Sequence, residues 1–199
     1  VVFEDEAFRQ FCVEHFDADR NGMITDGEVS SVDSLSVPSM EIVSLKGIEA
    51  FASLQKLYCY DNKIEALDLN ANGELTVLGC HYNDLEELSL SANTKLTSLN
   101  CNHNRISKLD LSALTELREL HVQYNELGEL DLSGNPRLGI LQCMENWLTE
   151  LDITKCPDLT MLWADPMPTL ETLYWTQAQA DNMFALIFVP ESTEKVVRE

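Results

Sequence analysis

One block of 21 residues occurs six times in this chain, and it constrains the fold more than any other feature. Each copy starts at a leucine, and the six are Leu54, Leu75, Leu96, Leu117, Leu138 and Leu159. The first five copies share the pattern L-x-x-L-x-C-x-x-N-x-L-x-x-L-D-L-S-x-N-x-x, and the sixth departs from it after Ala164. Such a period is typical of a solenoid, in which each copy forms one coil and buries its apolar side chains by stacking on its neighbours.

The invariant slots of the block predict its local structure. The L-x-x-L-x-C segment has apolar residues at every second position, which predicts a short strand with those side chains pointing inward. An asparagine follows each predicted strand and turns the chain; these residues are Asn62, Asn83, Asn104, Asn125 and Asn146. Because a buried amide has two N–H donors and a carbonyl acceptor, this slot can satisfy backbone groups at the turn.

Four of the six cysteines share one slot of the block: Cys59, Cys80, Cys101 and Cys143. Val122 and Ala164 fill the same slot in other copies, so the slot accepts small apolar side chains. Stacked parallel strands lie about 4.8 Å apart with side chains pointing the same way, whereas a disulfide needs converging Cβ atoms about 3.8 Å apart. We therefore interpret the column as buried free thiols, with disulfide bridges as the alternative.

The charge of the chain excludes several classes of partner. Its 34 acidic and 13 basic side chains give a formal net charge of −21. That charge repels nucleic acids and anionic membrane surfaces, and it attracts cations. No apolar run reaches the roughly 18 residues of a membrane span, so no transmembrane segment is predicted.

The segment before the repeats has a second motif, DADRNGMITDGE over residues 17–28. It resembles the calcium loop of an EF-hand, with Gly22 at the sharp turn. The resemblance implies a set of Ca²⁺ ligands, which are Asp17, Asp19, Asn21, Met23 (through its carbonyl), Thr25 (through water) and Glu28. Apolar residues at helical spacing from Phe8 to Phe16 predict an entering helix. We interpret the loop as a structural Ca²⁺ site, and the alternative is a cap without metal.

The repeated block itself resembles the leucine-rich repeat, in the short 21-residue form of bacterial surface proteins with an internalin-like layout. This resemblance implies parallel strands, and asparagines that bond the backbone of neighbouring turns. It also implies a secreted or cell-surface location, with a lipid anchor as one way of attachment. Internalin-like proteins have a helical cap likened to a truncated EF-hand without metal.

We therefore predict a leucine-rich-repeat solenoid of parallel β-strands and irregular coils, with a small helical EF-hand-like N-terminal cap and a C-terminal β cap. Residues 1–31 are expected to form the helical cap and 32–53 an irregular starter repeat. Residues 54–180 are expected to form six repeats, and 181–199 the C-terminal cap and tail. The apolar run Met183–Val189 is expected to close the open end, with Trp175 and Phe184 as covers.

The variable slots on the strand side hold most of the aromatic and histidine residues. They predict a partner-binding face made of Tyr58, Tyr60, His81, Tyr82, His103, His121, Tyr124 and Trp163. Such side chains offer contact area and hydrogen bonds at low entropic cost. We expect an unidentified protein to bind here; a short glycan, or a spacer with no ligand of its own, are the alternatives. The opposite side is mostly acidic, which is typical of a solvated surface, and we expect a monomer.

Catalysis is not predicted. The sequence has no G-x-S-x-G, P-loop or Rossmann glycine pattern. His81, His103 and His121 fall in three different slots, and no cysteine or carboxylate joins them at the spacing of metal ligands. The prediction is a non-enzymatic binding module whose one cofactor is Ca²⁺.

Overall fold

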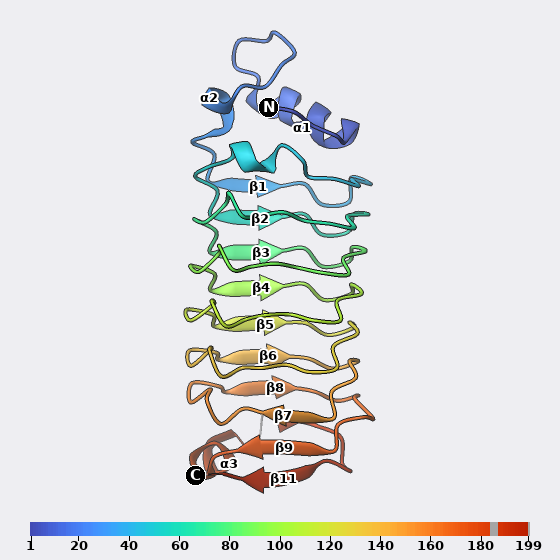
Figure 1. Cartoon of the computed structure of the whole chain (residues 1–199), viewed down its shortest axis with the longest axis vertical. Coiled ribbons are helices and arrows are strands. Elements are labelled where there is room, and N and C mark those ends of the chain that lie inside the picture. The colour runs from blue at the N-terminus through green and yellow to red at the C-terminus, as the bar shows by residue number, and fades with distance from the viewer. Residues whose placement is uncertain (184–186, 199) are drawn as a thin grey trace.

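The computed structural model describes residues 1–183 and 187–198. The chain forms an elongated stack of coils, with two helices at the N-terminal end and a third near the C-terminal end (Figure 1). The N-terminal helices are α1 (Glu6–Phe16) and α2 (Asp26–Val29), and a 3-10 turn, Ile48–Ala50, follows the first strand.

One parallel sheet runs along the stack in the order β1-β2-β3-β4-β5-β6-β8-β10. Its strands are β1 (Ser34–Ser36), β2 (Lys56–Tyr58), β3 (Val77–Gly79), β4 (Ser98–Asn100), β5 (Glu119–His121), β6 (Ile140–Gln142), β8 (Met161–Trp163) and β10 (Ile187–Phe188). A second parallel sheet, in the order β11-β9-β7, lies at the C-terminal end. Its strands are β7 (Glu150–Asp152), β9 (Thr172–Trp175) and β11 (Glu194–Val197).

The strand register follows the period of the sequence. Leu57 pairs with Leu78, and Leu78 pairs with Leu99, so each partner lies 21 residues further along the chain. The same step continues through β5, β6 and β8. The predicted parallel solenoid with an N-terminal helical cap is therefore confirmed. Equivalent side chains of successive coils form straight columns along the stack.

The core is built from these columns. The leucines that open each copy are almost fully buried, and the shared cysteine slot is completely buried at Cys59, Cys80, Cys101 and Cys143. All six cysteines are free thiols. Burial raises the pKa of Cys59, Cys101 and Cys143 to about 12 and that of Cys80 well above its ordinary value, so these thiols are uncharged small hydrophobes.

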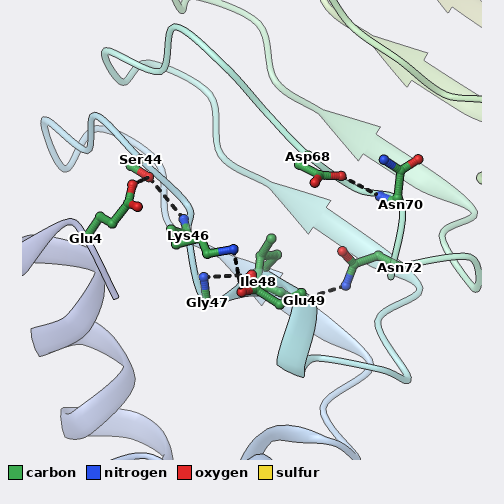
Figure 2. Close-up of polar contacts among 9 residues, drawn as sticks. All are labelled: Glu4, Ser44, Lys46, Gly47, Ile48, Glu49, Asp68, Asn70 and Asn72. Atoms are coloured by element: carbon green, nitrogen blue, oxygen red, sulfur yellow. Dashed lines mark hydrogen bonds and ion pairs between the residues drawn. The ribbon is translucent and has the colours of Figure 1, made fainter. Parts of the chain in front are cut away.

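Polar contacts join the N-terminal cap to the first coils. The Asp5 carboxylate caps α1 by accepting from the Phe8 amide at 2.9 Å, and it also accepts from the Val43 amide at 2.8 Å. Figure 2 shows the neighbouring contacts, in which Ser44 Oγ donates to Glu4 at 3.3 Å and Lys46 Nζ lies 3.0 Å from Glu49. The cap is thus held by a buried hydrogen-bonded carboxylate as well as by apolar packing.

The C-terminal end differs in detail from the β cap that the sequence analysis expected. Helix α3 (Gln177–Met183) was not predicted, and the apolar run begins at its last residue instead of forming one strand. Ile187 and Phe188 form β10, Trp175 is buried, and the predicted cover Phe184 lies outside the described residues. The helix was missed because a single residue fixes it: Gln179 Nε2 donates to the carbonyls of Ile153 and Cys156 at 2.7 and 2.9 Å.

Candidate binding face

The strand register places the predicted face residues in columns on one surface. Tyr58, His121 and Trp163 share one column, together with Gly79, Asn100 and Gln142. A Cβ at Gly79 would lie 3.2 Å from Cδ1 of Tyr58, so the absence of a side chain there leaves room for the Tyr58 ring. Tyr60 stacks on His81 in the next column, with 4.5 Å between ring centroids.

Three of the predicted residues form a continuous stack at the turn that follows the strands. The His103 ring lies between Tyr82 and Tyr124, with centroid distances of 4.1 and 4.2 Å. All three residues have a positive φ of 50° to 56°, a left-handed conformation that is uncommon outside glycine. The rings cover one another's faces, so they present mainly their edges to solvent.

Two histidines of this surface are biased toward the neutral form. Burial, and secondarily the positive charge that His103 and His121 would carry, lowers the pKa of His81, and Asp61 opposes this shift. Burial also lowers the pKa of His103, whose Nδ1 lies 2.9 Å from Asn102 Oδ1. Near neutral pH the stack therefore acts as an uncharged aromatic surface with hydrogen-bonding groups.

An apolar patch at the C-terminal end of the face was not recognised in the sequence. Trp163 and Phe188 pair on adjacent strands, with their rings edge to face at 6.0 Å, and both are exposed. Half-buried aliphatic side chains surround them, and the complete patch is Ile140, Met144, Met161, Trp163 and Phe188. The C-terminal patch, as we call it, was missed because β10 lies outside the repeated block, so nothing in the period placed Phe188 beside Trp163.

The five predicted asparagines form a ladder beneath the face. Asn104 is typical: its Nδ2 donates to the carbonyls of Cys80 and Cys101 at 3.1 and 3.0 Å, and its Oδ1 accepts from the Leu85 amide at 3.0 Å. Asn62, Asn83, Asn125 and Asn146 make the equivalent bonds. Each amide thus links its own turn to the preceding one, which fixes the position of the face residues.

A second ladder of buried amides was not singled out from the sequence, although its asparagine slot is part of the repeated pattern. Asn72, Asn93 and Asn135 are fully buried, and their Nδ2 atoms donate to carbonyls of their own coil or the preceding one. Figure 2 shows the first of these bonds, from Asn72 to the Ile48 carbonyl. Gln179 supplies the same kind of bond from α3 and so completes this ladder at the C-terminal end.

The acidic surface opposite the strands has a local structural cause. The carboxylates of Asp68, Asp110, Asp131 and Asp152 each accept from the backbone N–H two residues further on. These Asx turns account for the aspartate of the L-D-L-S pattern without a ligand. A hollow of about 840 Å³ lies on this side, where Arg198 pairs with Asp152 and covers the Tyr174 ring at 3.2 Å.

The predicted calcium loop brings three carboxylates together. Ligand oxygens of Asp17, Asp19 and Glu28 all lie within 4.8 Å of one another. Backbone N–H groups hold these carboxylates in place, since Asp17 accepts from Gly22 at 2.7 Å and Glu28 accepts from Ala18 at 2.9 Å. Hydrogen bonds, from Thr25 first, lower the pKa of Glu28. For Asp17, partial desolvation raises the pKa, and the Gly22 and Asn21 amides outweigh it, so the net shift is downward.

The remaining predicted ligands lie in the same loop. Asn21 Nδ2 donates to Asp19 at 2.7 Å, and its Oδ1 accepts from the Met23 amide at 2.7 Å. The Thr25 hydroxyl donates to Glu28 at 2.9 Å. The donor set is therefore rich in oxygen and negatively charged, which suits a hard divalent cation.

Comparison with known proteins agrees with this architecture. The family model described as leucine-rich repeat matches residues 95–117, and the chain is a leucine-rich-repeat protein with internalin-like structural neighbours. No curated protein sequence matches the chain.

Two of the similar solved structures come from Listeria monocytogenes. The functional domain of InlJ, which includes a cysteine ladder, is 30% identical over 88% of this chain with a TM-score of 0.63, and the chain spans 42% of its length. Internalin C2 is 22% identical over 95% of this chain and 94% of its own, with a TM-score of 0.76. A leucine-rich-repeat protein of Leptospira interrogans is 20% identical over 87% of this chain and 51% of its own, with a TM-score of 0.68.

Proposed function

We propose that the chain is a non-catalytic binding module that holds a protein partner on its strand face at the bacterial cell surface. The observation that carries this proposal is the segregation of side chains. Aromatic and histidine residues from successive coils share one exposed surface, while the opposite surface is occupied by aspartates engaged in Asx turns. Similarity to internalin structures supports a secreted or surface location, with a lipid anchor as one form of attachment.

A protein partner is favoured over a glycan by the geometry of the rings. Sugar rings bind aromatic side chains by stacking on their faces, but Tyr82, His103 and Tyr124 already stack on one another. Ring edges, amides and the nearby Trp163 offer the mixed apolar and polar surface that is typical of protein interfaces. Within the described residues no helix has the length and apolar character needed to cross a bilayer.

The test compares a face variant with a matched variant of the opposite surface. The triple substitution Tyr58→Ala, His121→Ala and Trp163→Ala should abolish binding to surface-protein and glycan arrays, and leave the melting temperature nearly unchanged. The control carries Glu65→Ala, Glu86→Ala and Glu129→Ala and should bind as the wild type does. Unchanged binding of the face variant would exclude this surface, and hits confined to the glycan array would favour the glycan alternative.

We also propose that the loop 17–28 binds one structural Ca²⁺, through Asp17, Asp19, Asn21, the Met23 carbonyl, Thr25 and Glu28. The gathered carboxylates support this proposal, and the ion would add cross-links between the end of α1 and the start of α2. Its role would be to rigidify the cap over the first coils, because a short α2 of 4 residues offers little surface for a sensor that opens on binding.

Calorimetric titration with CaCl₂ and thermal melts with EDTA test this site. The wild type should bind one equivalent, and EDTA should lower its melting temperature. Asp17→Ala with Glu28→Gln should remove both effects, whereas Glu14→Gln, an exposed acid on α1, should leave them intact. A wild type that takes up no Ca²⁺ would mean that the loop is a metal-free cap.

A further inference from the structure

The C-terminal patch is a compact apolar area within the strand face. Ile140 and Met161 are neighbours on β6 and β8, and Trp163 and Phe188 are neighbours on β8 and β10. Adjacent strands lie about 4.8 Å apart, so these four side chains form a two-by-two cluster that Met144 extends toward the turn. Trp163 is 36% exposed and Phe188 50% exposed, which is unusual for large apolar side chains that lie side by side.

The charges around this patch are all negative. Glu119 lies beside Ile140 on the neighbouring strand, and Asp165 and Glu145 follow Trp163 and Met144 in the chain. Within the part of the chain that the structure describes, none of these three carboxylates has an ion-pair partner. Lys56, at the other end of the sheet, is the one lysine or arginine in the four strand-face columns of the copies.

These observations select among the occupants that an apolar patch could have. A second copy of the chain would bring another net charge of −21 against the same acidic rim, so self-association is disfavoured. An anionic membrane surface is disfavoured for the same reason. A cationic segment gains instead, because its charges meet the rim carboxylates and can also lie over the Trp163 ring.

We propose that the C-terminal patch binds a positively charged segment of the partner protein, with an apolar side chain of that segment packed against Trp163 and Phe188. This inference rests on the proposed function, and it adds the chemistry of the partner and the part of the face that provides the anchor. The aromatic stack of Tyr82, His103 and Tyr124 then contributes contact area beside the anchor. Burial of the apolar side chain supplies the affinity, and the carboxylates set the specificity and the rate of association.

A random peptide display library, selected on the immobilised wild-type protein, provides the probes. Selected peptides are then synthesised and titrated by fluorescence anisotropy against wild type and variants. We expect an excess of Lys and Arg around one apolar residue. Trp163→Ser with Phe188→Ser should weaken binding by about tenfold or more, as loss of an interface anchor does. Trp147→Ser removes a tryptophan that is 64% exposed but lies outside the patch, and it should leave binding unchanged.

The rim is tested by Glu145→Gln with Asp165→Asn. This variant should bind the same peptides more weakly at low salt and lose part of the salt dependence that the wild type shows. Melting curves of all variants verify that each is folded, because the substituted side chains are exposed or half-buried.

Several results would overturn the proposal. They are selection of neutral or acidic peptides, failure to select any peptide, and equal binding by the Trp163→Ser, Phe188→Ser variant. Peptides that lose binding to Tyr58→Ala with His121→Ala, but keep it with the patch variant, would reject the patch and leave the strand face as the binding surface. Dimers in sedimentation that the patch variant abolishes would identify a second copy as the occupant.

Discussion

At the scale of single residues, the amides of the first ladder do most to define this molecule. Each asparagine satisfies backbone groups of two successive turns that would otherwise be buried without partners. An unsatisfied buried backbone group costs about 1–3 kcal/mol. The side chain is thus both a turn residue and a cross-link between coils.

Replacing Asn104 by Ala should therefore lower the free energy of unfolding by about 1–3 kcal/mol, because two carbonyls and one amide lose their partner. Urea denaturation followed by circular dichroism measures the change. Asn70→Ala is the control, since that exposed side chain makes no ladder bond. Equal stability of Asn104→Ala and wild type would show that the ladder is not a source of stability.

His81 gives the molecule a dependence on pH that can be measured. Because burial lowers the pKa of His81 in the folded chain, the unfolded chain binds the proton more tightly. The free energy of unfolding should be at its full value above the unfolded pKa of about 6.5 and should decrease as the pH falls through that value.

His81→Gln should flatten this decrease when unfolding is measured by urea titration between about pH 7.5 and pH 5.5. His15→Gln, on the exposed side of α1, should retain the wild-type slope. Identical slopes for His81→Gln and wild type would contradict the assignment.

At the scale of elements, the ends of the stack depend on contacts that occur once. Asp5 joins α1 to the first coils by accepting from the amides of Phe8 and Val43, which are far apart in the sequence. Gln179 joins α3 to the last coils in the same manner. Both residues are buried polar groups with their partners in place.

Asp5→Ala should lower the melting temperature and release the cap, because α1 loses its N-cap and the Val43 amide loses its acceptor. The N-cap alone is worth about 1 kcal/mol. Hydrogen exchange should show faster exchange over α1 than over β4, and Glu6→Ala serves as the control. Uniform exchange across the molecule would mean that the cap and the coils unfold together without a weak junction.

These contacts also explain how far the sequence alone could predict the structure. Every contact that recurs from coil to coil is written into the 21-residue period, so the strands, the cysteine column and the asparagine slot were accessible from the pattern. Asp5, Gln179 and Phe188 act through single contacts with no period, and no local signal marked them. The left-handed conformation of Tyr82, His103 and Tyr124 was also missed, because aromatic residues rarely adopt it.

At the scale of the whole molecule, the C-terminal end of the stack is the side open to pairing. Strand β11 is the edge of its sheet, and Lys195 lies in register with buried Leu173, so alternation puts this lysine on the inward-facing side. An inward-pointing charge on an edge strand discourages another chain from adding to the sheet. The net charge of −21 opposes association as well.

Lys195→Val should therefore increase self-association, because the edge becomes a continuous apolar strand of three valines. Sedimentation velocity over a range of protein concentrations measures the change. Lys195→Arg keeps the charge and should behave as the wild type does. A variant that stays as monomeric as the wild type would show that other features protect this edge.

The constant step of 21 residues has a consequence for how such a molecule can change over generations. Since each coil is bonded only to the coils directly before and after it, a duplication or excision of one whole period would splice cleanly and leave both ends seated. An insertion of any other size would put every later side chain out of line. The gene can therefore adjust the reach of the binding surface like a ruler cut in fixed units, while the terminal coils stay the same.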